Sequence, residues 1–498
     1  MADRLRRRTN LTAIGLSALT AILALSACDP RGNLTKKRIK AVERGLMHVA
    51  YLKGLQPEKL SLAARMAFLK VPAVSIAVID RNKIEWARAY GQKDAQTGVP
   101  PTTGTVFQGG AFSQMIAAAA VLGLVESGAA DLDAPLGRVF GDDLPPPTSV
   151  TPDPGRALTF RSLLSHSAGL SDQVFPGYNQ DEPIPKLARI LRGEKPANSV
   201  PPWYPPARPL AARAQYSESG YVYVQEALER LTGMRFADLI REKIFGPFGL
   251  MDSTLNETLT DEMRTRAASG HLREGQPVMG LWRIYPETAA KGLWTSPSDF
   301  ALFLCDLLTS ATGGPGKLLS PVWARVMLSP QVENYGLGFL VEGSGDDVVF
   351  TLRTKTLGYA CAMVLYPAKG QGAVIMTNSD NGALIIQEIL CALSEAYMWP
   401  HFKPEEKTVL RLGPETYAAF EGRYEVNPSY VLDVAREDYY LVIRPTGQAA
   451  TKFYAEGQTL FYSTDPYIRI QFFSDKQGRI DSLVLWQQDF ELQAKRIQ

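Results

Sequence analysis

The stretch Phe107-Gln-Gly-Gly-Ala-Phe-Ser-Gln-Met115 leads directly into Met115-Ile-Ala-Ala-Ala-Ala-Val-Leu-Gly-Leu-Val-Glu126. The second segment is apolar on every face, which indicates a buried central helix rather than a surface helix. A helix that is covered on all sides needs further layers of structure around it. The segments that flank this helix therefore decide the fold.

Strand-like segments occur on both sides of the central helix. Val74–Asp80 and Ile84–Tyr90 flank a short polar turn, which predicts a hairpin. Far downstream, an amphipathic helix is expected over Ala383–Tyr397, and it follows three predicted strands: Val348–Leu352, Ala360–Tyr366 and Gly372–Thr377. This order predicts an α+β domain with an inserted helical region, in which one antiparallel sheet takes strands from both ends of the sequence.

The pattern of the chain changes after Pro400. Short strands follow at near-regular spacing: Tyr439–Arg444, Thr459–Tyr462, Tyr467–Phe472 and Asp481–Trp486. This rhythm is typical of a small barrel or sandwich. We therefore expect one large domain over residues 28–403 and a small all-β barrel domain over residues 404–498.

The first 28 residues have the layout of a secretory signal peptide. A basic start that includes Arg4 precedes the uncharged stretch Leu11–Ala27, which ends in Leu25-Ser-Ala-Cys28. A Cys directly after small residues resembles the bacterial lipoprotein box, in which the Cys becomes the acylated N-terminus of the mature chain. We expect a signal peptide over residues 1–27, a lipid on Cys28, and a location in the bacterial cell envelope, facing the periplasm or the exterior. The alternative is a plain N-terminal anchor, for which the apolar run is short.

Composition argues against several classes of protein. The 498 residues carry 53 Lys and Arg against 51 Asp and Glu, mixed along the chain, whereas a nucleic-acid-binding protein normally shows a basic face. The four Cys form no Cys-x-x-Cys pair and the four His are scattered, so we expect no metal site and no cofactor. Four Cys in this length also exclude a disulfide-dense scaffold.

A set of stretches between residues 158 and 382 forms a second pattern: Leu158-Thr-Phe-Arg-Ser-Leu-Leu-Ser-His-Ser-Ala-Gly-Leu170, Phe175-Pro-Gly-Tyr178, Tyr216-Ser-Glu-Ser-Gly-Tyr221, Ile244–Thr254, Lys291-Gly-Leu-Trp-Thr-Ser-Pro-Ser-Asp299, Tyr335-Gly-Leu-Gly338 and Thr377-Asn-Ser-Asp-Asn-Gly382. In this order they resemble the serine β-lactamase and penicillin-binding-protein superfamily, in its class C-like esterase and peptidase branch. The tail after residue 404 looks like the lipocalin-like barrel that follows many such domains.

The resemblance implies acyl-transfer chemistry. In that family a Ser nucleophile opens the central helix, and a Lys three residues later lies on the same helix face. The Lys and a Tyr from a Tyr-x-Asn-like motif act as base and proton shuttle, because a free Ser hydroxyl is a poor nucleophile. A Lys-Thr-Gly or His-x-Gly strand holds the substrate carboxylate and lines the oxyanion site.

When the family's helix motif is matched to this sequence residue by residue, its two key positions hold different side chains. Ala111 stands in the Ser position and Gln114 in the Lys position. Tyr216 and Ser217 match the second motif, but Glu218 replaces the usual Asn or Gly. Alanine has no heteroatom to acylate, and glutamine is no base near neutral pH.

The strand motif is also altered. Leu352-Arg-Thr354 stands where His-x-Gly is expected, and Lys355-Thr356 resembles a displaced Lys-Thr-Gly without the small third residue. Of the four parts that the mechanism needs, only the Tyr remains. We therefore expect no intact catalytic residue, and we take Ser217, Glu218, Thr354 and Lys355 as candidate binding residues.

Four residues near these motifs can each be interpreted in more than one way. Ser113 lies two positions, about 200°, from Ala111 on a helix and is expected to point away from the site. His166 invites a Ser-His interpretation, but a His that satisfies local backbone groups is the simpler one. Tyr216 either binds a ligand or fills the vacated pocket. Glu218 either favours cationic ligands, pairs with Lys355, or is a solvated surface residue.

Three functions are compatible with these residues. The first is a lipid-anchored pseudo-hydrolase of the cell envelope that binds a peptide, a peptidoglycan fragment or a protein partner without turnover, and that binds no nucleic acid. The second is an active hydrolase of the esterase or β-lactamase type with an atypical nucleophile, an assignment that would rest on fold alone. The third is a structural interaction protein whose cleft has closed.

The leader generates a first prediction. The wild-type protein should partition into the detergent phase and carry a lipid on Cys28, whereas Cys28→Ala should abolish the modification. Mass spectrometry of the N-terminal peptide and detergent-phase partitioning measure this. Detergent partitioning that persists in Cys28→Ala with the leader uncleaved would favour the plain anchor.

Overall fold

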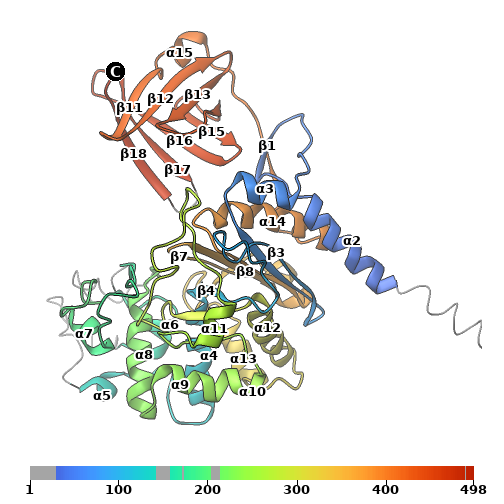
Figure 1. The fold of residues 1–498 in the computed structure, drawn as a ribbon, viewed down its shortest axis with the longest axis vertical. Coiled ribbons are helices and arrows are strands. Elements are labelled where there is room, and N and C mark those ends of the chain that lie inside the picture. The colour runs from blue at the N-terminus through green and yellow to red at the C-terminus, as the bar shows by residue number, and fades with distance from the viewer. Residues whose placement is uncertain (1–29, 142–157, 171–172, 203–213, 488–489) are drawn as a thin grey trace, which may run out of the picture.

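The computed structural model describes residues 30–141, 158–170, 173–202, 214–487 and 490–498. The expected signal peptide and Cys28 lie outside the described residues. Figure 1 shows a large layered body with a barrel at one end. Within the described ranges, no helix has both the length and the apolar character that a membrane crossing requires.

A six-stranded antiparallel sheet forms the centre of the large body. Its order is β3 (Lys83–Gly91), β2 (Ala73–Asp80), β9 (Gln371–Thr377), β8 (Tyr359–Tyr366), β7 (Val349–Thr356) and β6 (Leu340–Glu342). β2 pairs with β9, with Val74 opposite Thr377, so strands from both ends of the chain meet in the middle of the sheet. The predicted α+β arrangement is therefore confirmed.

Helices cover both faces of this sheet (Figure 1). On one face, α2 (Pro30–Arg44), α3 (Leu62–Phe68) and α14 (Gly382–Tyr397) pack against alternate strand residues such as Ile76 and Ala362. The neighbouring residues Ala77 and Met363 belong to the core on the other face. This alternation follows from the two-residue period of a strand and explains why β2 and β8 are almost entirely apolar.

The opposite face is covered by the inserted helical region. Its central helix, α4 (Phe112–Glu126), is buried from Phe112 to Leu122, as its uniformly apolar sequence predicts. It is flanked by α8 (Ser219–Thr232) and α12 (Pro297–Ala311). The remaining elements of the region are β4 (Phe107–Gly110), α5 (Gly137–Phe140), α6 (Phe160–Leu164), α7 (Leu187–Arg192), α9 (Phe236–Ile240), the π-helical turn η2 (Arg241–Phe245), α10 (Gly246–Phe248), α11 (Asp261–Arg266), β5 (Leu293–Thr295) and α13 (Pro321–Met327).

The C-terminal strands close into an eight-stranded antiparallel barrel, which confirms the predicted all-β module. After the short helix α15 (Pro414–Ala418), the strands are β11 (Gly422–Asn427), β12 (Tyr430–Glu437), β13 (Tyr440–Pro445), β14 (Thr451–Ala455), β15 (Leu460–Thr464), β16 (Tyr467–Ser474), β17 (Ile480–Gln487) and β18 (Phe490–Arg496). The barrel strands pair with one another in chain order and β18 returns to β11. The expected boundary at residues 403–404 falls between α14 and β10 (Glu405–Lys407), which pairs in parallel with β1 (Ala50–Leu52).

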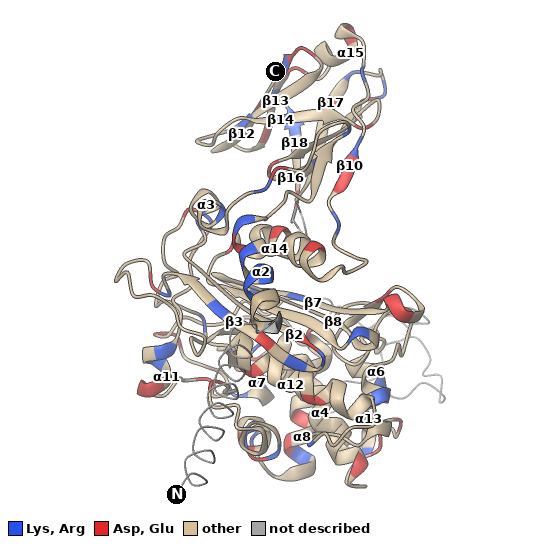
Figure 2. Ribbon diagram, turned by 90° about the vertical axis from the view of Figure 1, so that its right-hand side faces the viewer, with Lys and Arg blue, Asp and Glu red and all other residues tan. Residues whose placement is uncertain are grey.

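Charged residues are distributed over both the layered body and the barrel, and acidic and basic positions are intermixed along the ribbon (Figure 2). This distribution agrees with the nearly balanced composition of 53 basic and 51 acidic residues.

The hairpin between β7 and β8 generates the second prediction. Gly358 has φ +83°, and a Cβ there would lie 2.8 Å from both Gly270 Cα and His271 N, whereas Gly128 has φ +75° with open space around it. Gly128→Ala should lower the free energy of unfolding by about 1–2 kcal/mol through backbone strain. Gly358→Ala should lower it by about 1–3 kcal/mol more, because overpacking adds to the strain. Denaturant titration measures both, and equal losses would refute the packing argument.

Candidate functional site

Ala111 occupies the N-cap position of α4, directly after β4. It is 1% exposed, and its backbone N–H donates a hydrogen bond of 2.8 Å to Thr354 Oγ1 on β7. Gly110, which precedes it, has φ +51°, and a Cβ there would lie 2.4 Å from the same Thr354 oxygen. Glycine therefore permits the close approach of β7 to the beginning of the central helix.

Gln114 lies about one helical turn after Ala111 on α4, and it contacts Tyr216 from a distant part of the chain. Gln114 is fully buried, and its Nε2 donates to the Tyr216 hydroxyl at 3.1 Å. Its Oε1 is buried and has no hydrogen-bond partner in the described part of the chain. Burial raises the pKa of Tyr216, so its phenol is protonated at neutral pH. The Tyr216 ring packs on His166, with 4.7 Å between ring centroids.

Glu218 corrects two of the sequence expectations. It is 4% exposed rather than solvated, and it forms its ion pair with Lys291, at 2.9 Å, rather than with Lys355. Its second carboxylate oxygen accepts a hydrogen bond of 3.2 Å from the backbone N–H of Phe175. Burial raises the pKa of Glu218, while Lys291 and these hydrogen bonds oppose the rise.

The site therefore contains two direct polar pairs. Gln114 donates to the Tyr216 hydroxyl, and Lys291 binds the Glu218 carboxylate. Glu218 lies near enough to Tyr216 for its charge to add to the rise of the pKa of the phenol. Gln114 Oε1 is the buried acceptor left over in the first pair.

A second buried acid lies near this pair. Glu287 is fully buried, and neither of its carboxyl oxygens has a partner among the described residues. Burial raises its pKa to about 8, with a further rise from the nearby Glu218 and an opposing effect of Lys291. At neutral pH Glu287 is therefore a neutral carboxylic acid. Sequence reasoning missed the roles of both Glu287 and Lys291. The signal that could have indicated a buried Lys291 was its place as a charged side chain inside the run of small residues Ala289-Ala-Lys-Gly292.

Other predicted residues have structural contacts. Ser113 is fully buried and turned away: its hydroxyl donates to Gly110 O at 2.8 Å and accepts from Leu293 N at 2.9 Å. His166 Nδ1 accepts from the Ser217 backbone N–H at 3.1 Å, and burial lowers the pKa of His166 to about 4. This imidazole is therefore neutral. Lys355 follows Thr354 on β7, where successive side chains leave opposite faces, and of the two it is Thr354 that contacts Ala111.

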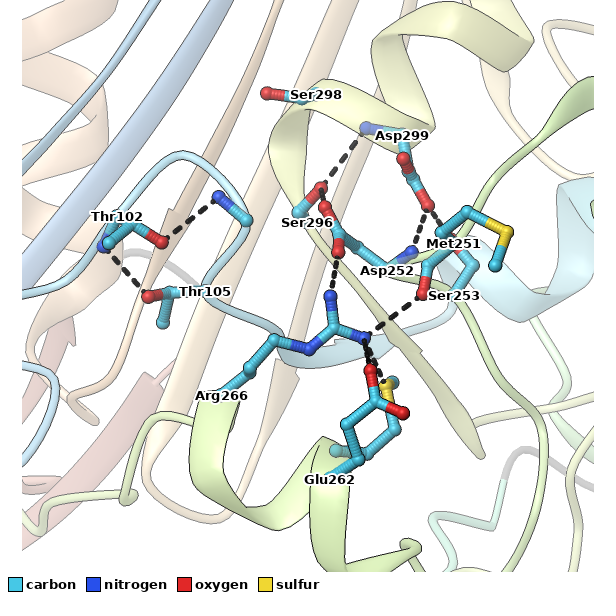
Figure 3. Close-up of polar contacts among 12 residues, drawn as sticks. Thr102, Thr105, Met251, Asp252, Ser253, Glu262, Arg266, Ser296, Ser298 and Asp299 are labelled. Carbon is cyan, nitrogen blue, oxygen red and sulfur yellow. Dashed lines mark hydrogen bonds and ion pairs between the residues drawn. The ribbon is translucent and has the colours of Figure 1, made fainter.

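A polar cluster lies at the beginning of α12, where Ser296, Asp299, Asp252 and Arg266 contact one another (Figure 3). The Ser296 hydroxyl caps α12 by accepting from Asp299 N at 3.1 Å, and Asp299 in turn accepts from Asp252 N at 2.8 Å. Arg266 pairs with Asp252. The cluster ties the turn after α10 to α12, while β5 pairs with β4, which leads to Ala111. The position of Ala111 is thus set by elements on both sides.

The buried pair generates the third prediction. Lys291→Met should lower the free energy of unfolding by about 3–5 kcal/mol, because it leaves the Glu218 charge buried without its partner. The double variant Glu218→Gln/Lys291→Met should lose much less than the sum of the two single variants. Urea denaturation of the wild type, both single variants and the double variant gives the coupling energy. Simple additivity would mean that the two charges do not stabilise one another.

Comparison with known proteins assigns the fold. A family model described as beta-lactamase matches residues 61–386. Penicillin-binding protein 4 of Amycolatopsis lactamdurans is 31% identical over 225 residues, which are 44% of this chain and 54% of that protein, so the chain spans about half of that relative. Penicillin-binding protein 4* of Bacillus subtilis is 22% identical over 379 residues, 69% of this chain and 79% of the relative.

Solved structures extend the likeness to the barrel. The octameric penicillin-binding protein homologue from Pyrococcus abyssi superimposes with a TM-score of 0.57 at 19% identity, over 87% of this chain and 98% of its own. D-amino acid amidase from Ochrobactrum anthropi matches with a TM-score of 0.52 at 22% identity, over 67% and 95% of the two chains. At these identities the structures show the fold alone. Since the family model covers most of the large body, the chain belongs to the beta-lactamase family, with a C-terminal eight-stranded barrel.

Proposed function

We propose that this protein is a lipid-anchored pseudo-hydrolase of the bacterial cell envelope, which binds a peptide or peptidoglycan fragment without turnover. The observation that carries the proposal is the first turn of α4. There, Ala111 and Gln114 lie beside Tyr216 in the positions that sequence analysis matched to the nucleophile and the base. Covalent acyl transfer needs both of these groups.

The backbone donor at Ala111 supports the same conclusion. In acyl transfer, preorganised N–H groups stabilise the oxyanion, and the N–H of the nucleophile residue is one of them. Here the Ala111 N–H is already bonded to Thr354 Oγ1 at 2.8 Å. A substrate carbonyl would have to displace this internal bond. Thr354, considered above only as a binding residue, thus competes with substrate for the donor.

An atypical nucleophile has little support at this site. The Ser113 hydroxyl is fully buried and holds two backbone groups, Gly110 O and Leu293 N. Tyr216 is kept protonated by its environment, and Glu218 is bound by Lys291 and by the backbone N–H of Phe175. None of these three side chains is positioned to attack a carbonyl carbon next to Ala111.

Binding, in contrast, needs only a reachable polar surface. Tyr216 and Thr354 remain partly exposed beside the buried Gln114 and Ala111, which they contact. They offer hydroxyl groups to a peptide backbone or carboxylate, and the unpartnered Gln114 Oε1 would accept from an amide N–H that reached it. Relatives named as penicillin-binding proteins favour cell-wall peptides as the ligand class. The expected lipid on Cys28 would keep the protein near that polymer.

The fourth prediction concerns acylation. The wild type should form no adduct with penicillins or fluorophosphonates, and Ala111→Ser should stay within about twofold of background because its hydroxyl lacks a base. Ala111→Ser/Gln114→Lys should acylate at least about tenfold faster than Ala111→Ser, in line with the usual gain from a positioned base. Adding Thr354→Ala should raise the rate again by freeing the Ala111 N–H. Intact-protein mass spectrometry and the burst of product from an activated ester follow each variant.

Two controls make this test decisive. A stoichiometric burst from the wild type that Ser113→Ala abolishes would overturn the proposal and establish Ser113 as a relocated nucleophile. For the binding claim, soluble peptidoglycan fragments should raise the Tm of the wild type, as any ligand of the folded state does. Tyr216→Ala should reduce this rise. No rise in the wild type at millimolar fragment would remove the ligand class from the proposal.

A further inference from the structure

A compact charged cluster lies between the sheet layer and the barrel. Arg65 of α3 donates from Nε and Nη2 to Glu388 of α14, at 2.9 and 2.6 Å. The same guanidinium donates from Nη1 and Nη2 to Asp465, in the turn between β15 and β16, at 3.1 and 2.7 Å. Arg65 is 5% exposed. One guanidinium thus binds two carboxylates with a pair of hydrogen bonds each, which is the strongest geometry for this kind of contact.

His48 completes the cluster. Its Nδ1 lies 3.4 Å from Glu388 Oε1, and its Nε2 lies 3.7 Å from Asp465 Oδ2. The Phe68 ring lies beside the guanidinium, 4.8 Å from its carbon. Asp465 is the only barrel residue among these five, and its side chain is 32% exposed. Removing it would break the link to the barrel while leaving the Arg65–Glu388 pair intact.

Three of these residues also have the spacing of a metal site. Ligand atoms of His48, Glu388 and Asp465 lie within 4.8 Å of one another. However, the Arg65 guanidinium already sits between the two carboxylates, and a divalent ion would have to displace that positive charge or stand beside it. Arg65 therefore supplies the positive charge that joins the two carboxylates.

The barrel has further contacts on the same side. Lys407 of β10 binds Glu456 of the barrel at 2.9 Å and lies 6.0 Å from the Tyr467 ring centroid.

We propose that Arg65 is a latch that docks the barrel on the sheet layer through Asp465. The inference does not depend on whether the site turns over a substrate. It concerns how the barrel is held on the large body.

Asp465→Ala in the full chain is the main test. Trypsin cleavage between α14 and α15, at Lys407 or Arg411, should become at least about tenfold faster, because local opening of the barrel exposes this segment. Amide hydrogen exchange should rise in the same segment. The matched control is Asp433→Ala, which removes an exposed ion pair to Arg423 within the barrel. It should change neither readout.

Two further outcomes decide between the alternatives. Arg65→Ala should release the barrel in the same way, and it should also lower the stability of the large body because Glu388 stays buried without its partner. If Asp465→Ala matches Asp433→Ala in both readouts, the latch is wrong. If Zn²⁺ alone raises the Tm of the wild type but not that of His48→Ala, the cluster is a metal site, and the latch is equally overturned.

Discussion

The pairing of β2 with β9 is the interaction on which the rest of the structure depends. It joins a strand near the beginning of the chain to one that lies some 300 residues later, with Val74 opposite Thr377. Between them the chain leaves the sheet after β3 and returns to it at β6, and the intervening residues form the helical region around α4. The same pairing sets β8 and β7 in order beside β9, which brings Thr354 to the first turn of α4. The site is therefore a product of sheet order rather than of local sequence.

Local patterns were enough to predict most of the fold. Alternation and turn residues predicted the β2–β3 hairpin, the three late strands and several barrel strands, and the uniformly apolar run predicted α4. Strands such as β11 and β18 were missed although polar and apolar residues alternate in them, because each strand has only two or three apolar side chains. At the site, the contact of Gln114 with Tyr216 was expected from motif order. The Glu218–Lys291 pair and the Thr354 hydroxyl on the Ala111 N–H were not, since they join segments far apart in the chain and leave no periodic trace.

The interior of the site contains two pairs of buried or half-buried polar groups, Gln114 with Tyr216 and Glu218 with Lys291. Buried polar groups that are fully paired stabilise a unique packing, whereas a half-paired set would be costly. Two groups remain outside this pattern, Gln114 Oε1 and the neutral acid Glu287. They mark the places where the interior can still accept a donor.

The Arg65 cluster also constrains how the sequence can change over time. One guanidinium binds acids from α14 and from a barrel turn, so both carboxylates depend on Arg65 for their partner. A substitution of Arg65 alone would leave two carboxylates facing each other and His48, and a substitution of Glu388 alone would leave the guanidinium partly unmatched in a buried setting. We therefore expect a single substitution at any one of these positions to be selected against. A lineage that altered this junction would have to pass through paired replacements, and homologues that keep the barrel in this orientation should vary at these positions together or not at all.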